Sequence, residues 1–140
     1  PDIVIIDRKL KIKRTLDFVS KRRKIADRYD HLLTNLPLVT PKQEKYALSS
    51  RHLYVIRIKN DQSKSSHRET FRLLRKNNIL VNLHYIPIHL QPFYRKLGFK
   101  RGDYPNAESY YKKAISLPIY FSLSNKDQDY VVDILSKILK

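Results

Sequence analysis

A long amphipathic stretch near the start of the chain limits the folds that this sequence can adopt. Between residues 8 and 36, apolar side chains recur at spacings of three and four, with one gap at Arg23, and this spacing is typical of one face of a helix. They are Ile12, Leu16, Val19, Ala26, Tyr29, Leu33 and Leu36. At 1.5 Å per residue the helix is about 40 Å long, which is more than a small domain needs for itself. Pro37 ends it, because the residue before a proline avoids helical backbone.

The rest of the chain predicts short strands that alternate with helices. Alternating apolar and β-branched residues indicate three strands, at residues 52–58, 79–85 and 115–120, and the proline in the third favours a sheet edge. Helical spacing and serine N-caps indicate further helices, at residues 66–76, 106–114 and 125–139, with a helical turn at 92–98 and an irregular segment at 37–50.

This order of elements predicts an α+β fold. We expect a small, roughly three-stranded and mainly antiparallel sheet that is covered by helices and preceded by the long N-terminal helix. A length of 140 residues fits one domain. We therefore predict that residues 1–140 form a single domain. Within it, residues 8–36 form a long linker-type helix and residues 37–140 form the small domain.

The basic charge of the chain is concentrated in one part of it. The formal net charge is +16, and residues 51–101 contain twelve Lys and Arg against Asp61 and Glu69. Such a field attracts anions, including nucleic acid, anionic lipid and nucleotide phosphates, but a solvated basic surface without a dedicated partner carries the same signature. The absence of cysteine excludes disulfides and thiolate metal sites, and it is compatible with a reducing cytoplasm. The longest apolar run is Ile3 to Ile6, far shorter than the ~20 residues that cross a bilayer.

The segment HYIPIHLQPFYRKLGF, residues 84–99, is aromatic, proline-rich and almost uncharged before Arg95. A metal site, a binding wall and a core turn are the three interpretations. Common zinc sites need three or four ligands, whereas His84 and His89 have no acidic residue close in sequence, so we expect no metal. The two glycines of the chain are too few for a phosphate-cradling loop or a nucleophile elbow. A stiff binding wall and a packed core turn both remain open.

The segment LHYIPIHLQPFYRKLGFKRGDYPNAESYYKKAISLPIYFSLS resembles the C-terminal part of the DegT/DnrJ/StrS family. These are pyridoxal-phosphate-dependent aminotransferases that act on nucleotide-linked keto-sugars. The sequence of residues 84–99 is most similar to that of the transaminases of the pseudaminic acid pathway. The resemblance continues upstream through HLYVIRI and LDFVSKRRKIADRYDHLL and covers about residues 16 to 140.

The resemblance implies a substrate-binding role for His84, Tyr85, His89 and Gln91, at the mouth of the active site. In the family a large domain holds the cofactor on a lysine beside a glycine-rich phosphate motif, and no such motif occurs in this chain. We therefore assign no catalytic, cofactor-binding or metal-binding residue here. Pyridoxal phosphate belongs to the complete family enzyme, and we expect this cytoplasmic chain to be inactive alone.

The expected partners follow from the same resemblance. They are a nucleotide-sugar substrate, a chain that carries the large domain, and a second copy that covers the apolar face of the first helix through Ile3 to Ile6, Leu16 and Val19. Neither a membrane nor a nucleic acid is the expected partner. A basic module that binds an anion such as RNA is the alternative function. As the small domain of such an enzyme, the chain is then a fragment, a split-gene product or the remnant of a decayed gene. The start at Pro1 fits removal of an initiator methionine, and we expect a genuine short product rather than an internal cut.

Overall fold

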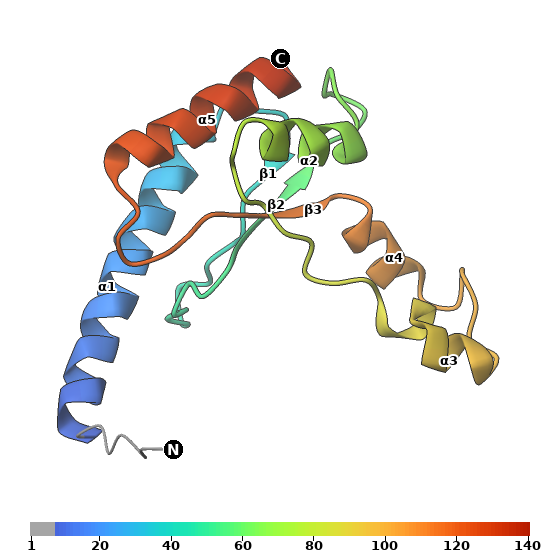
Figure 1. Cartoon of the computed structure of the whole chain (residues 1–140), viewed down its shortest axis with the longest axis horizontal. Helices are drawn as coiled ribbons and strands as arrows, with labels where there is room; N and C mark the ends of the chain where they lie inside the picture. Colours follow the sequence, from blue (N-terminus) through green and yellow to red (C-terminus); the bar gives the residue numbers. More distant parts are fainter. Residues whose placement is uncertain (1–7) are drawn as a thin grey trace.

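The computed structural model describes the backbone of residues 8–140 and the side chains from residue 15 onward (Figure 1). From residue 8 onward, three short strands are interspersed among the helices. In order they are α1 (Arg8–Leu32), β1 (Leu38–Val39), β2 (Tyr54–Ile58), α2 (His67–Lys76), the 3-10 helix η1 (Ile88–Leu90), α3 (Pro92–Lys96), α4 (Pro105–Tyr111), β3 (Ala114–Leu117) and α5 (Asn125–Leu139).

The three strands form one antiparallel sheet in the order β1-β2-β3. Side chains along β2 alternate, so that Tyr54, Ile56 and Ile58 are buried while Arg57 is exposed, as expected for a strand with one face in the core. This confirms the α+β fold with a small antiparallel sheet and a long N-terminal helix.

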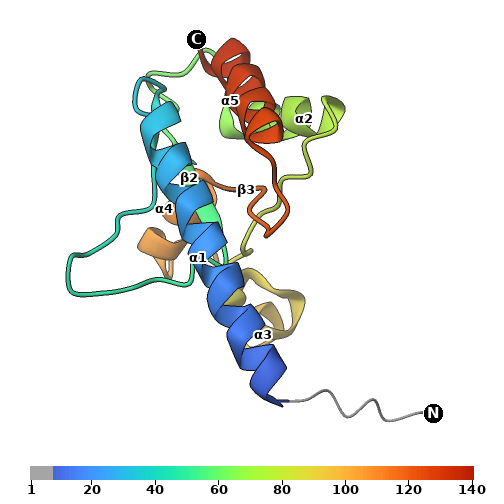
Figure 2. The same ribbon diagram turned by 90° about the vertical axis from the view of Figure 1, so that its left-hand side faces the viewer.

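The C-terminal half of α1 packs into the hydrophobic core, and α5 lies beside this half of α1 (Figure 2). The ring of Tyr29 on α1 lies 5.0 Å from the ring of Tyr54 on β2. The buried Gln128 of α5 donates a hydrogen bond of 2.9 Å to the carbonyl of Ile25. Burial raises the pKa of both tyrosines, so the phenols remain neutral core groups.

The predicted helix signals of α2 and α5 are confirmed. Ser66 accepts a hydrogen bond from the backbone N–H of Glu69, and Ser124 accepts one from that of Asp127, which satisfies donors that a helix start leaves free. Asn78, just after α2, has a φ of 59°, the left-handed geometry that ends a helix. The apolar face predicted for α5 is also in the core.

One predicted strand is wrong. Residues 79–85 make a single bridge, from Asn82 to Ser116 of β3, so β3 lies nearly at an edge of the sheet. It ends at Leu117, and Pro118, the proline of the predicted strand, follows it. The third strand is instead β1, within the segment that we expected to be irregular. Ile79 and Val81 are buried. The alternation of apolar residues in this segment therefore reflects burial of their side chains, not hydrogen bonding to a neighbouring strand.

Two predicted helix ends also differ from the structure. Helix α1 ends at Leu32, four residues early, because the Thr34 hydroxyl donates to the carbonyls of Asp30 and His31 and the chain turns there. Helix α4 ends at Tyr111, three residues early, because residues from Ala114 onward pair with β2.

The exposed end of α1 bears on the predicted second copy. Leu16 is 67% exposed, whereas Ile3 to Ile6 lie outside the described residues. None of the described helices combines the length and the apolar character that a membrane-spanning helix needs.

Candidate functional site

The loop that carries the predicted site residues starts beside β3, where Asn82 pairs with Ser116. Asn82 and Ser116 exchange backbone hydrogen bonds of 3.3 and 2.9 Å, and the Nδ1 atom of His84 lies 2.7 Å from the Ser116 hydroxyl. The end of β3 therefore fixes the position of the first predicted site residue.

The loop is then held by tight local structure. Pro87 precedes η1, and its carbonyl accepts a hydrogen bond of 2.9 Å from the N–H of Leu90. Pro92 occupies the first turn of α3, where a missing N–H costs nothing, and the Gln91 carbonyl accepts from the N–H of Arg95 at 3.0 Å. The two prolines fix their φ angles, and together with these bonds they support the prediction that the loop is stiff.

The structure divides the four predicted site residues into two groups. Tyr85 is 74% exposed, and His84 and Gln91 are half-buried, so these three can reach a ligand. The rings of His84 and Tyr85 meet edge to face, with centroids 4.7 Å apart. In contrast, His89 is only 6% exposed, and its ring points into the protein between η1 and α4.

His89 forms a buried polar pair with Glu108 of α4. The Nε2 atom lies 2.9 Å from Oε1 of the carboxylate, and the same oxygen accepts a hydrogen bond of 2.7 Å from the backbone N–H of Gly102. The Gly102 N–H first, then His89, and then the charge of Arg101 hold the pKa of Glu108 below its usual range. The carboxylate is therefore ionised at neutral pH and joins three segments of the chain.

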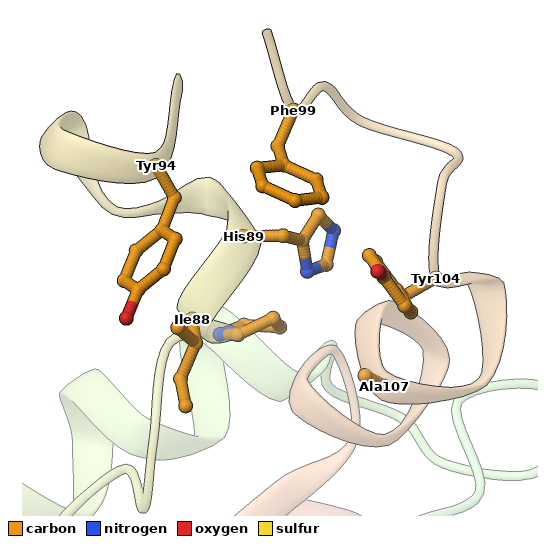
Figure 3. Close-up of a pocket in the computed structure, with 7 residues that line it drawn as sticks. Ile88, His89, Tyr94, Phe99, Tyr104 and Ala107 are labelled. Atoms are coloured by element: carbon orange, nitrogen blue, oxygen red, sulfur yellow. The ribbon is translucent and has the colours of Figure 1, made fainter. Parts of the chain in front are cut away.

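An apolar cavity of about 430 Å³ lies beside this pair (Figure 3). One edge of the His89 ring forms part of its wall, and the Tyr104 ring is 4.8 Å away. The remaining lining is aromatic or aliphatic and comes from η1, α3, α4 and the residues next to η1 and α3, namely Pro87, Ile88, Tyr94, Phe99 and Ala107. Such a lining can receive a planar or apolar group.

Sequence reasoning missed Glu108 and Ser116 as partners of the two histidines. Spacing along the sequence indicates only acids that are close to His89, whereas Glu108 is 19 residues away. The placement of Glu108 in the first turn of the predicted helix after Pro105 was an available signal. Within the described side chains, no three His, Asp or Glu residues group in a way that could hold a metal ion.

The lysines and glycines of the described residues bear on whether this part of the chain could hold pyridoxal phosphate. From residue 15 onward no lysine is buried, whereas a covalent-catalysis lysine needs a shielded amine with a lowered pKa. The two glycines, Gly98 and Gly102, lie in turns near α3 and not before a long helix that could receive a phosphate.

A family model for DegT/DnrJ/EryC1/StrS aminotransferases matches residues 8–136. The chain belongs to this family. Its sequence is 36% identical over 132 residues to the spore coat polysaccharide biosynthesis protein SpsC of Bacillus subtilis, covering 92% of this chain and 34% of that protein.

Solved structures of sugar aminotransferases share the fold. The pyridoxal-phosphate form of the putative sugar aminotransferase Spr1654 from Streptococcus pneumoniae matches with a TM-score of 0.83 and 29% identity, over 94% of this chain and 34% of that one. PseC of Helicobacter pylori, an aminotransferase involved in pseudaminic acid biosynthesis, matches with a TM-score of 0.81 and 26% identity, over 91% and 34%. The chain spans about a third of the length of the curated relatives it matches.

Proposed function

We propose that this chain is the C-terminal small domain of a pyridoxal-phosphate-dependent aminotransferase that acts on nucleotide-linked keto-sugars. The reaction would serve surface polysaccharide or glycan biosynthesis in the cytoplasm. The family match over residues 8–136 carries the proposal. The polysaccharide role in the name of SpsC and the pseudaminic acid role of PseC support the sugar class.

The cofactor would be held outside this chain. Pyridoxal phosphate supplies the electron sink for amino-group transfer when it is bound. Because every described lysine is at least partly exposed, we assign the cofactor lysine to the family's large domain, outside these 140 residues. By itself the chain then has no transaminase activity.

The substrate role belongs to the loop after Asn82. His84, Tyr85 and Gln91 present polar atoms from a backbone that the two prolines stiffen, so that little conformational entropy is lost on binding. His89 contributes the wall of the apolar cavity, while its Nε2 atom is engaged by Glu108.

The first experiment tests the chain alone. The purified protein is incubated with pyridoxal phosphate, reduced with borohydride and mapped by mass spectrometry. We expect scattered, substoichiometric labelling of surface lysines and no characteristic cofactor absorbance. One stoichiometric adduct at a single lysine, with matching absorbance, contradicts the assignment of the cofactor to a partner.

The second experiment supplies the missing part. The chain is fused to, or coexpressed with, the remaining two-thirds of SpsC, and amino transfer to a nucleotide-linked keto-sugar is measured. His84→Ala and Tyr85→Phe should each lower turnover. Tyr110→Phe, which alters another exposed tyrosine on α4, is the matched control and should not. Equal effects of Tyr85→Phe and Tyr110→Phe remove Tyr85 from the site.

The same proposal includes a possible homo-oligomer through the N-terminal half of α1, where Leu16 is exposed. Sedimentation equilibrium at high protein concentration checks it, with Leu16→Glu expected to shift the chain towards monomer. A strict monomer before any substitution contradicts the oligomer.

A further inference from the structure

Ser116 is a buried polar residue of β3. It lies between Ile115 and Leu117, which both belong to the hydrophobic core, and it is only 4% exposed. Because side chains alternate along a strand, Ser116 points to the other face of the sheet, together with its cross-strand partner Val55 on β2. A polar side chain that is buried in this way needs a hydrogen-bond partner.

The partner of the Ser116 hydroxyl is the ring of His84. The backbone N–H of Ser116 donates a hydrogen bond of 2.9 Å to the carbonyl of Asn82, and its carbonyl accepts one of 3.3 Å from the N–H of Asn82. These two bonds hold the start of the loop against β3. The hydroxyl oxygen then lies 2.7 Å from Nδ1 of His84, and within residues 15–140 the hydroxyl makes no other hydrogen bond.

A hydrogen bond between a serine hydroxyl and a neutral imidazole can run in two directions. The imidazole carries one proton, on Nδ1 or on Nε2, and the hydroxyl carries one that it can donate. If Nδ1 of His84 carried the proton, it would donate to Ser116, and the hydroxyl proton would be buried without an acceptor, which is costly. If Nε2 carries the proton, the hydroxyl donates to Nδ1 and both groups are satisfied. The contact therefore favours the Nε2–H tautomer of His84.

The Nε2 atom of His84 is accessible to solvent. Within residues 15–140 it makes no hydrogen bond, and the side-chain polar atoms there that are both buried and unpaired are Nε of Arg22 and Oε1 of Gln128. An unpaired Nε2 that is absent from this buried set has contact with solvent. It belongs to a ring that also meets the Tyr85 ring edge to face, at 4.7 Å between centroids.

The second histidine of the loop uses its ring nitrogens differently. Nε2 of His89 lies 2.9 Å from the carboxylate of Glu108, and the His89 side chain is only 6% exposed. That nitrogen is engaged inside the protein and is not available to a ligand. Of the two histidines, His84 is therefore the one that offers Nε2 at the surface while a buried residue holds its other nitrogen.

We propose that Ser116 is a positioning residue that holds neutral His84 as the Nε2–H tautomer, so that His84 presents a hydrogen-bond donor to the bound ligand. The ligand atom that it would recognise is an acceptor oxygen of a hydroxyl, carbonyl or phosphate group, because a neutral Nε2–H can only donate. In this role His84 orients the ligand and does not act as a base. The inference rests on the proposed function in one respect, since it takes the loop to face the substrate. The tautomer itself is independent of the reaction.

The tautomer is measured by long-range proton–nitrogen correlation NMR of the purified chain at about pH 8, where an ordinary histidine is neutral. Loss of signals in His84→Gln assigns the ring. We expect Nε2–H to exceed Nδ1–H by at least about tenfold, a stronger preference than that of the exposed His52, whose side chain makes no hydrogen bond within residues 15–140. Ser116→Ala should lower the preference of His84 to that of His52, and Ser116→Thr, which restores a hydroxyl, should recover it. Ser136→Ala, on α5, is the matched control and should leave it unchanged.

Three NMR results overturn the proposal: an excess of Nδ1–H in the unmodified chain, a ratio for His84 equal to that of His52, or a ratio that Ser116→Ala leaves unchanged. The ligand role has a separate test in the chain fused to the rest of SpsC. There Ser116→Ala should lower kcat/KM for a nucleotide-linked keto-sugar several-fold, and it should have little further effect when combined with His84→Ala. Additive losses overturn the positioning role and leave the proposed function standing. If the fused enzyme has no transaminase activity while the NMR results hold, only the proposed reaction is wrong.

Discussion

The body of the molecule and the segment around α3 and α4 are held together by different forces. In the body, α1, α2, α5 and the sheet bury large apolar side chains such as Tyr29, Ile56 and Leu135 almost completely. In contrast, every residue from 92 to 107 is exposed, and α3 buries none of its side chains. We call residues 84–113, which include this exposed stretch, the arm. The arm is held in place by prolines, by the His84–Ser116 contact and by the His89–Glu108 pair.

This difference bears on function. A body held by burial of apolar area is stable without help from a ligand, whereas an arm held by a few polar contacts can keep aromatic and cationic side chains at the surface. Exposed aromatic groups beside cations are typical of binding surfaces rather than of structural ones. The proposed substrate residues lie on the arm.

The largest expected effect is in the body. Ile56→Ala removes a fully buried side chain and should lower the free energy of unfolding by about 2–5 kcal/mol, because transfer and cavity costs add. Urea denaturation followed by circular dichroism measures it. Leu97→Ala, on a 62% exposed leucine of the arm, is the control and should stay within about 0.5 kcal/mol. Comparable losses for the two variants would remove the distinction between body and arm.

An intermediate effect is expected at the buried polar pair. Glu108→Gln keeps the shape but removes the charge that the Gly102 N–H and His89 both engage, so the arm should lose about 1–3 kcal/mol of local stability. Hydrogen exchange should show faster exchange at the Gly102 amide and no change at the β2 amides. His89→Ala should act in the same direction. A substrate-binding role alone predicts little change in stability for His89→Ala, whereas the burial of His89 predicts a loss.

If exchange accelerates equally in β2 and at Gly102, the arm is part of the same cooperative unit as the body, and the comparison fails. Glu69→Gln provides a matched control. Glu69 also has a lowered pKa, mainly through its hydrogen bond to Arg72, but it lies on the surface of α2 and its loss should leave the arm unchanged.

A smaller effect is expected from pH. The pKa of Glu108 is lowered in the folded state, so its ionisation stabilises the arm fully above the unfolded carboxyl pKa of about 4.3. That contribution is lost as pH falls through the lower folded pKa. The Gly102 amide should lose exchange protection below about pH 4, and Glu108→Gln should abolish this pH dependence. Persistence of the same acid transition in Glu108→Gln assigns it to another carboxyl group.

The smallest effect on stability is expected at the exposed substrate residues. Tyr85→Phe and His84→Ala should each change the free energy of unfolding by no more than about 0.5 kcal/mol, although the contact of His84 with Ser116 places it at the upper end. Thermal unfolding measures both. A loss above about 2 kcal/mol for His84→Ala identifies the ring as a structural hydrogen-bonding group and withdraws its proposed contact with substrate.

The sequence by itself determined the elements that local chemistry specifies. Apolar spacing predicted the buried faces of α5 and of the C-terminal half of α1, and serines predicted the starts of α2 and α5. Each of these depends on residues within a turn or two. The resemblance of residues 84–99 to a family also required no coordinates.

Only the tertiary structure decided which segments meet. Residues 79–85 have the pattern of a strand, yet the two-residue β1 takes the place beside β2, since pairing depends on where the loops bring each segment and on what else buries its side chains. His89 and Glu108 are 19 residues apart, and His84 and Ser116 are 32 apart, so neither contact leaves a local signal. The same holds for Arg95, Lys100 and Arg101, because the sequence shows only three basic residues and the structure shows that they line one cavity.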